Sequence, residues 1–288
     1  GRKLAVKIQY PGVKDSIDSD VDNVATLLRV SGLLPASVDY KSLLQQAKQQ
    51  LKQEADYTRE AGFLMRYQQL LAGDNRYLLP HALPELSSAN LLTMTYVEGV
   101  PIESLQNEPQ PIRDRVMQQL FSLLFRELFD FKLVQTDPNF ANYLYNNASQ
   151  QLVLLDFGAC RKYSAEFSLA YRALFKAALA SDTAAMAQAL TAIGFFSQTI
   201  VAEQKQAVLQ LVSLACEPLM HDSAFDFGNT DLALRLREAG TALSLQQNYW
   251  HAPPADAVFL HRKIAGMYLL AARLKAKVNV RALLQPYL

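Results

Sequence analysis

The sequence predicts an α+β fold in two lobes, a small strand-containing lobe over residues 1–98 and a large, mostly helical lobe over residues 99–288. Three observations support this prediction. The run LAVKIQY at residues 4–10 is rich in β-branched and apolar residues and stops at a Pro-Gly pair, which is typical of a strand. Apolar residues recur at helical spacing over residues 39–71. From Ser164 onward the pattern is almost wholly helical.

The remaining elements follow in an order that fits this division. Short strands are expected at YLLP and LLTMTYV, around the turn LSSAN, and the break at Glu98-Gly99-Val100-Pro101 is interpreted as a linker between the lobes. Beyond it follow an amphipathic helix over residues 111–131, a loop over residues 135–142 and a hairpin over residues 143–158.

The composition excludes several classes of protein. Lys and Arg total 28 and Asp and Glu total 27, so a formal net charge of +1 argues against nucleic acid as the main partner. Cys160 and Cys216 lack metal-binding spacing and favour a reducing compartment. No apolar run reaches the roughly 18 residues that a transmembrane span needs. Because the chain opens inside a strand-like segment without an initial Met, we expect a fragment that lacks its natural N-terminus.

Ionisable and amide side chains of the kinds used in phosphoryl transfer occur in the order that protein kinases use. A strand Lys neutralises phosphate oxygens, a helix Glu holds that Lys, a loop Asp orients the nucleophile, and an Asn and an Asp share magnesium ions. Each type alone is ordinary, since Asp and Asn also suit turns, but the ordered set predicts an ATP and Mg²⁺ site. The residues are Lys7, Glu54, Asp56, Glu60, Asp137, Asn142 and Asp156.

The strand LLTMTYV predicts an adenine-binding hinge. Met94 stands where a kinase cleft carries its gatekeeper residue, and the backbone groups of Tyr96 and Val97 stand where adenine binds. Apolar strands that end in Glu-Gly are common, so this signal is weaker than the ordered set of polar residues.

The whole set resembles the UbiB/ADCK family of atypical kinase-like proteins, in particular its coenzyme Q-associated members. The stretches VKIQYPGV, QEADYTREA, QTDPNFANYLY and LLDFGACRKY carry the resemblance, which covers nearly the whole chain. It implies a two-lobed protein-kinase-like fold, ATP binding and a role in ubiquinone biosynthesis. It also implies a peripheral position at the cytoplasmic face of the inner membrane in a bacterium, or in mitochondria in a eukaryote.

The resemblance assigns a role to each matching position. Lys7 matches the nucleotide-binding lysine, and Glu54 and Asp56 match the ExD motif. Glu60 matches the helix glutamate that pairs with the lysine. The other matches are Asp137 as catalytic acid, and Asn142 and Asp156 as metal ligands.

Glu54 and Glu60 compete for Lys7. On one continuous helix they lie about 240° apart, so both cannot face the same ammonium group. We favour Glu60 as its partner, with Glu54 turned toward the phosphates or a regulatory element.

The sequence also departs from the family and from ordinary protein kinases. The alanine-rich phosphate-covering loop and the KxGQ helix of the family are absent from this chain, so weak nucleotide binding is expected. After Asp156-Phe157-Gly158 the chain runs almost at once into a helix for which Ser164 is the expected N-cap. A peptide-docking platform is therefore not expected, and ATP hydrolysis or phosphorylation of a small or lipid-like molecule is favoured over a protein substrate. Gln135 replaces the usual His before the catalytic Asp.

Two other functions remain open at this point. One is a non-catalytic, nucleotide-gated lipid-binding scaffold for ubiquinone-biosynthesis proteins, and the other is a small-molecule kinase with a soluble acceptor. Partners therefore include ATP, quinone-biosynthesis proteins and anionic lipid. The basic helix HRKIAGMYLLAARLKAK at residues 261–277 is a candidate lipid-contacting surface, although a buried bundle helix is the favoured interpretation.

Overall fold

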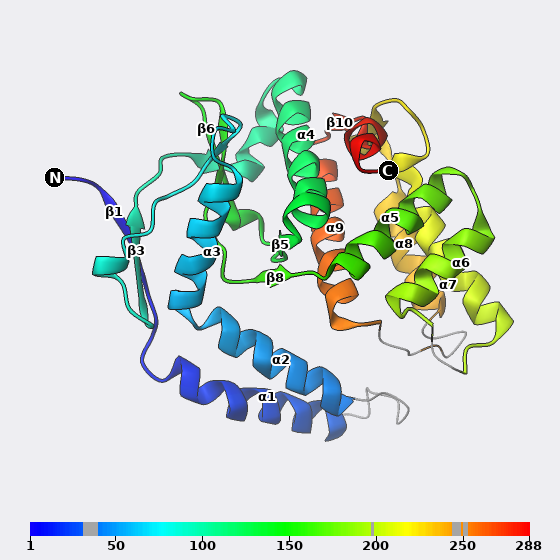
Figure 1. Ribbon diagram of the computed structural model, residues 1–288, viewed down its shortest axis with the longest axis horizontal. Helices are drawn as coiled ribbons and strands as arrows, with labels where there is room; N and C mark the ends of the chain where they lie inside the picture. Colours follow the sequence, from blue (N-terminus) through cyan, green and yellow to red (C-terminus); the bar gives the residue numbers. More distant parts are fainter. Residues whose placement is uncertain (31–39, 197–198, 244–248, 250–252) are drawn as a thin grey trace. The chain divides into compact units, whose positions relative to one another are not determined.

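The computed structural model describes residues 1–30, 40–196, 199–243, 249 and 253–288. In these ranges the chain has the predicted α+β content, with short strands and long helices (Figure 1). It divides into two compact units, each described by itself below. The first unit contains Gly1–Pro101 and Ala141–Cys160, and the second contains Ile102–Phe140 and Arg161–Leu288.

The first unit holds most of the strands. Its elements in chain order are β1 (Leu4–Ile8), α1 (Val13–Val30), α2 (Tyr40–Glu54), α3 (Tyr57–Leu70), β2 (Tyr77–Leu78), β3 (Leu91–Thr95), β4 (Val100–Pro101), β6 (Tyr143–Asn146) and β7 (Gln151–Leu154). The predicted division of the chain assigns residues 141–160 to the helical lobe, whereas the structure groups them with the N-terminal residues. The reason is strand pairing, since β7 pairs with β2 and β6 pairs with β4.

Two sheets set the geometry of the first unit. β1 and β3 form an antiparallel pair in which Lys7 lies opposite Leu92. β2, β7, β6 and β4 form the second sheet, with β6 and β7 joined as the expected hairpin. Along β1 the side chains of Ala5 and Lys7 are half-buried, while the alternate ones are exposed, as the period of two of a strand requires.

The predicted single helix over residues 39–71 is wrong, because the structure has two helices there. α2 ends at Glu54 and α3 begins at Tyr57. Asp56 between them has an extended backbone, and its Oδ1 accepts hydrogen bonds from the N–H groups of Thr58 and Arg59. An Asp at this position is a strong N-cap, so it starts a new helix rather than continuing the old one. α1 and α2 lie side by side as a helical pair (Figure 1).

The second unit is predominantly helical. Its elements in chain order are α4 (Gln110–Arg126), β5 (Leu133–Gln135), β8 (Cys160–Lys162), α5 (Ala165–Leu179), α6 (Thr183–Ile193), α7 (Ala202–Ala215), β9 (Phe225–Asp226), α8 (Leu232–Thr241), α9 (Ala255–Arg273), β10 (Lys277–Val278) and α10 (Val280–Leu284). The first residue of β8, Cys160, is grouped with the first unit. As expected, α5 is capped by Ser164, whose Oγ accepts a hydrogen bond from the N–H of Phe167 at 3.1 Å.

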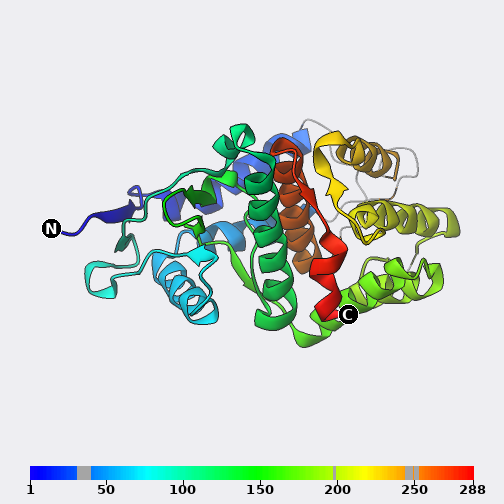
Figure 2. The same cartoon turned by 90° about the horizontal axis from the view of Figure 1, so that it is seen from above.

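α4 and α9 form the centre of this unit and lie side by side in both views (Figures 1 and 2). The ring of Phe121 on α4 lies 5.6 Å from that of Phe227 and 6.1 Å from that of Tyr268 on α9. α9 buries one face along its length, including Leu260, Met267 and Leu270. The bundle-helix interpretation of residues 261–277 is therefore supported.

The end of α4 differs from the single long helix predicted over residues 111–131. Regular α-helix stops at Arg126, and Glu127–Phe131 forms a π-helical turn that ends at Lys132 in the left-handed conformation. This turn carries the buried carboxylate of Glu127 toward the end of β5, where its Oε1 accepts a hydrogen bond from the N–H of Gln135. Within the described ranges, no helix combines the length and apolar character of a membrane span.

Candidate nucleotide site

Lys7 is the centre of a charged cluster in the first unit. Its Nζ lies 2.9 Å from both carboxylate oxygens of Glu60 and 2.8 Å from Oδ2 of Asp156. Lys7 comes from β1, Glu60 from α3 and Asp156 from the turn after β7, so three distant segments supply one site. The predicted pairing of Lys7 with Glu60 is present in the structure. The side chain of Glu54 lies outside the described residues, so its predicted position is not described.

The electrostatics of this cluster keep Lys7 charged. Burial by itself lowers the pKa of Lys7, but the carboxylates of Asp156 and Glu60 together outweigh it and raise the pKa to about 12. Glu60 is almost fully buried. Burial and the nearby charge of Asp156 raise the pKa of Glu60, while Lys7 opposes the shift. The cluster is thus one cation shared by two carboxylates that repel each other.

A tight turn fixes the carboxylate of Asp156. Its Oδ1 accepts a hydrogen bond from the N–H of Gly158 at 2.9 Å, which leaves Oδ2 to face Lys7. A β-carbon at Gly158 would lie 3.3 Å from Asp156 Oδ1 and 3.4 Å from Glu60 Oε2. The buried ring of Phe157 packs 4.7 Å from that of Tyr67 on α3 and anchors the turn. Every residue of the Asp-Phe-Gly triplet therefore has a defined structural part.

Arg59 is a positioning residue that the sequence interpretation misses. Its guanidinium donates to the carbonyl of Gly158 at 2.7 Å and to that of Cys160 at 2.6 Å. It stands three residues after the N-cap of α3 and directly before Glu60, so the helix that presents Glu60 also holds the backbone after Asp156. Its place between Asp56 and Glu60 within the family motif was the only available signal.

Asn142 and Asp156 lie at the same end of the β6–β7 hairpin. Tyr143 pairs with Leu154, and the carbonyl of Asn142 accepts a hydrogen bond from the N–H of Leu155 at 3.1 Å. Asn142 precedes one strand and Asp156 follows the other, so the hairpin register brings the two predicted metal ligands together. Asn142 is buried, which suits a fixed ligand better than a solvated turn residue.

These donors fit magnesium held together with a nucleotide. Among the described residues, no three His, Cys, Asp or Glu side chains gather as a self-contained metal site. Magnesium is commonly held by one or two carboxylates together with phosphate oxygens rather than by a complete protein cage. An Asn and an Asp beside a charged Lys form such an incomplete oxygen set, which phosphate oxygens would complete.

Asp137 belongs to the second unit. Its Oδ1 accepts a hydrogen bond from the N–H of Asn139 at 3.2 Å, which shapes the loop after β5. Two residues upstream, the Oε1 of buried Gln135 accepts a hydrogen bond from the Nζ of buried Lys263 at 2.9 Å. Glu127 Oε1 accepts the N–H of Gln135 at 3.4 Å. The loop in which Gln135 stands in place of the usual His is therefore anchored by Lys263 of α9 and by Glu127 of the π-helical turn.

Gly266 gives the same loop a close contact with α9. A β-carbon at Gly266 would lie only 2.5 Å from the Cβ of Pro138 and 3.3 Å from its Cα. Any larger residue would have to displace Pro138, which directly follows Asp137. Gly266 and Lys263 are three apart and so lie on one face of α9. The sequence interpretation misses both residues, because they stand far from the loop along the chain.

The predicted hinge residues occupy mixed environments. Met94 on β3 is buried, as a gatekeeper position would be, and it lies opposite Ala5. Tyr96 is exposed, and its N–H donates to the carbonyl of Lys3 at 3.1 Å. Val97 is half-buried. The N–H of Tyr96 is thus engaged within the first unit, and adenine contacts at these positions stay a prediction.

Similar proteins of known name support the resemblance. A Rattus norvegicus protein named "Atypical kinase COQ8B, mitochondrial" is 38% identical over 285 residues, which is 99% of this chain and 54% of the relative. A Saccharomyces cerevisiae protein named "Atypical kinase COQ8, mitochondrial" is 36% identical over 281 residues, 97% of this chain and 56% of the relative. A Caenorhabditis elegans protein named "Atypical kinase coq-8, mitochondrial" is 35% identical, and the chain covers 37% of it. The chain therefore spans about half or less of these relatives.

The fold has a counterpart among solved structures. The structure of Rv3197 from Mycobacterium tuberculosis, solved as a complex with erythromycin, aligns with a TM-score of 0.73 over 100% of this chain and 72% of that chain. At 20% sequence identity this likeness speaks for the fold alone.

Family membership follows from a match along most of the chain. A family model described as the ABC1 atypical kinase-like domain matches residues 1–190. This range includes all residues of the candidate nucleotide site. With the structural likeness, it confirms the expected two-lobed, kinase-like α+β fold. The chain belongs to the family of ABC1 atypical kinase-like proteins, and the resemblance to UbiB/ADCK proteins is confirmed.

Proposed function

We propose that this chain binds ATP with Mg²⁺ and acts as an atypical kinase or ATPase in support of ubiquinone biosynthesis. The observation that carries the proposal is the contact of Lys7 with both Glu60 and Asp156. Burial of the Glu60 carboxylate alone would call for one paired cation, but here the ammonium group of Lys7 is also bound by Asp156 from a different element, so it is held from two sides. Holding a lysine ammonium for phosphate oxygens is the purpose that this arrangement serves in phosphoryl transfer.

Each residue of the candidate site has a proposed role in this reaction. Lys7 neutralises charge on the phosphate oxygens, and Glu60 holds its ammonium group in position. Asn142 and Asp156 would hold magnesium, which would supply positive charge to neutralise the phosphate oxygens. Asp137 orients the attacking hydroxyl or water and accepts its proton. Asp56 supports the site by capping the helix that carries Glu60.

The acceptor is a small molecule, a lipid-like molecule or water rather than a protein. Between Gly158 and the start of α5 the chain forms only the short strand β8 and the Ser164 cap. An ordinary kinase uses a long activation segment at this place to dock a peptide. The absence of such a segment over residues 159–164 favours ATP hydrolysis or transfer to a small acceptor.

The proposed place of action is a peripheral position at a membrane, in mitochondria or at the bacterial inner membrane, beside quinone-biosynthesis proteins and anionic lipid. Three relatives carry the word mitochondrial in their names. The free, buried Cys160 and Cys216 are compatible with a reducing compartment.

Magnesium-dependent ADP release tests the proposal. The chain is assayed with and without cardiolipin-containing vesicles and a phenolic quinone-precursor analogue, beside Asp156→Asn. Asp130→Asn, a change at an exposed carboxylate, is the matched control. Turnover that is stimulated by the vesicles, lost in Asp156→Asn and kept in Asp130→Asn is the expected result.

Three other outcomes of this assay would favour a different function or a different acceptor. Magnesium-dependent ATP binding without any turnover favours the nucleotide-gated scaffold. Turnover that depends on a soluble polar acceptor and ignores lipid favours a small-molecule kinase. Stoichiometric phosphate transfer to a protein overturns the inference about the acceptor.

A further inference from the structure

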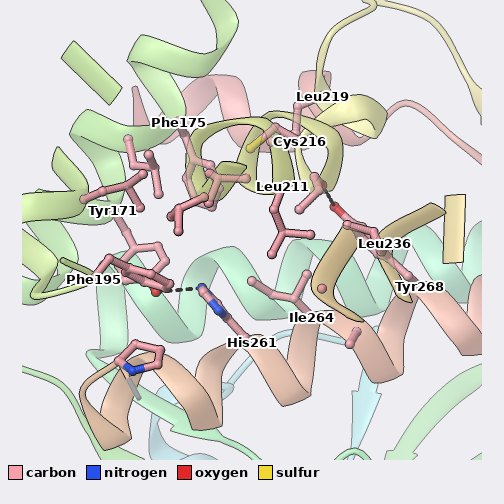
Figure 3. A pocket seen from close by; sticks show the side chains of 18 of the residues that line it. Tyr171, Phe175, Phe195, Leu211, Cys216, Leu219, Leu236, His261, Ile264 and Tyr268 are labelled. Carbon is pink, nitrogen blue, oxygen red and sulfur yellow. Dashed lines mark hydrogen bonds between the residues drawn. The ribbon is translucent and has the colours of Figure 1, made fainter. Parts of the chain in front are cut away.

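An apolar cavity that is partly open to solvent lies among the helices of the second unit, and the proposed ATP chemistry makes no use of it. Its walls come from α4, α5, α6, α7, α8 and α9, and its volume is about 480 Å³. Figure 3 shows side chains from several of these helices directed toward a common space, among them Tyr171, Leu211 and Ile264. None of the residues assigned to the nucleotide site lines it.

The described lining residues carry no charge at neutral pH. They include no Lys, Arg, Asp or Glu. Burial lowers the pKa of His261 to about 4 and raises the pKa of the Cys216 thiol to about 12, so both are neutral. A charged molecule that entered this space would lose its hydration without gaining an ionic partner, which is costly.

The tyrosine hydroxyls and the imidazole on the wall already have hydrogen-bond partners within the chain. The hydroxyl of Tyr171 and Nε2 of His261 are hydrogen-bonded at 2.8 Å, and the hydroxyl of Tyr268 donates to the carbonyl of Ala215 at 2.9 Å (Figure 3). Ligand affinity at this wall therefore comes from apolar contact rather than from hydrogen bonds. Leu, Ile, Val and Phe side chains form most of the remaining wall.

The size of the cavity suits a small-molecule ligand. An apolar cavity of about 150 Å³ is large enough to bind benzene. At about 480 Å³ this cavity is roughly three times larger and falls within the usual range of small-molecule sites. Apolar side chains on its wall lack neighbours that an apolar ligand would supply.

We propose that this cavity is a second ligand site, which binds an uncharged, hydrocarbon-rich small molecule. The molecule is held by burial of its apolar surface against α5, α7 and α9. The site is independent of ATP turnover, so its test measures binding and not activity.

The first measurement is a fluorescence titration of the 288-residue chain with the uncharged probe N-phenyl-1-naphthylamine. We expect saturable binding of one probe per chain. Decan-1-ol, decanoate and decylammonium are then compared as competitors, because they share a hydrocarbon chain and differ in charge. The alcohol is expected to displace the probe at least tenfold more effectively than either ion. Absence of saturable binding, or equal displacement by all three, overturns the proposal.

Two variants test whether the probe binds in the cavity. Ala265→Phe on α9 and Leu211→Trp on α7 add bulk from two walls and are each expected to weaken probe binding at least tenfold. Leu269→Phe is the matched control, because Leu269 is exposed on the same helix and does not line the cavity. Unchanged binding in both wall variants, with circular dichroism like that of the parent chain, contradicts the proposal.

A second readout covers the case in which the wall variants fold poorly. The unmodified chain is photolabelled with an uncharged diazirine-bearing fatty alcohol and digested for mass spectrometry. Labels on peptides from the lining segments of α5, α7 and α9, suppressed by excess decan-1-ol, support the assignment. Labels confined to other peptides overturn it.

Discussion

Gly266 of α9 lies in direct contact with Pro138, so closely that a β-carbon at position 266 would come within 2.5 Å of the proline Cβ. Because Pro138 follows Asp137, the shape of one helix face sets the position of the proposed catalytic loop. Lys263, three residues earlier, binds Gln135 on the other side of Asp137. The loop is therefore anchored to α9 on both sides of its acid.

Gly266→Ala is expected to reduce kcat for ATP turnover by about tenfold to a hundredfold, because a shift of roughly 1 Å in a catalytic group has effects of this size. KM for ATP should change much less, since Pro138 is not assigned to nucleotide binding. Steady-state kinetics separate the two parameters. Gly62→Ala is the control, as a β-carbon at Gly62 meets nothing within 4 Å and Ala favours a helix interior. An unchanged kcat in Gly266→Ala would show that the contact does not position Asp137.

Lys7 and Glu60 are expected to be energetically coupled. Lys7→Met leaves Glu60 buried beside Asp156 without its cation, which is strongly destabilising, while Glu60→Gln removes part of that repulsion. The double variant should be more stable than the sum of the single effects by about 1–3 kcal/mol. Urea unfolding of the four proteins measures this coupling.

The exposed ion pair of Lys52 and Asp18 serves as the comparison for that cycle. Surface pairs contribute little to stability, so a cycle at these two residues should show little or no coupling. Equal coupling in both cycles would mean that burial of Glu60 has no special effect.

Arg59→Lys is expected to loosen the turn after Asp156. A lysine cannot donate in the forked geometry with which Arg59 reaches the carbonyls of both Gly158 and Cys160. Faster amide hydrogen exchange over residues 157–160 and a several-fold loss of ATP turnover are expected. Arg66→Lys, at an exposed position on the same helix, is the control. Unchanged exchange in Arg59→Lys would remove Arg59 from the positioning of Asp156.

His261 predicts a loss of stability in mild acid. Desolvation lowers the pKa of this half-buried imidazole to about 4 in the folded chain, against an ordinary value of 6.5. Between these values the unfolded chain binds a proton that the folded chain does not, so lowering the pH favours unfolding. The contribution is full above pH 6.5, falls through pH 4 and amounts to about 3 kcal/mol.

The measurement is the free energy of unfolding between pH 8 and pH 4 for the parent chain and His261→Gln. The variant should lose stability less steeply with falling pH, by close to one proton in slope. His221→Gln changes an exposed histidine and should follow the parent. Identical slopes in the parent and His261→Gln would show that the imidazole is not buried in the neutral form.

The structural elements that the sequence predicts correctly depend on local patterns. Strand character around Lys7, the turn at Asp156 and the N-cap at Ser164 all depend on neighbouring residues, and each is present in the structure. The break before α3 is also a local feature, since Asp56 suits an N-cap, but the apolar spacing on both sides conceals it. Helix α1 carries apolar residues at helical spacing, with Ile17, Val21 and Ala25 buried, so the pattern was readable from the sequence, but the sequence interpretation does not assign this helix.

Long-range contacts explain what the sequence does not predict. Lys263 and Gln135 are 128 residues apart, and a buried lysine in a helix looks the same in sequence as an exposed one. In the sequence Gly266 looks like an ordinary helix glycine, and only the structure shows its close contact with Pro138. The cavity is equally hidden, because the apolar residues that line it follow the same helical pattern as residues that pack tightly.

The grouping of residues 141–160 with the N-terminal residues has a consequence for how the protein is made. Lys7 leaves the ribosome 149 residues before Asp156, which at about 5–20 residues per second is a delay of roughly 7–30 seconds. During that time β2 lacks β7, and the carboxylate of Glu60 lacks the turn that encloses it. The nascent N-terminal segment therefore cannot complete its fold until the middle of the chain has been synthesised. A ribosome that stalled before residue 160 would carry an incomplete first unit.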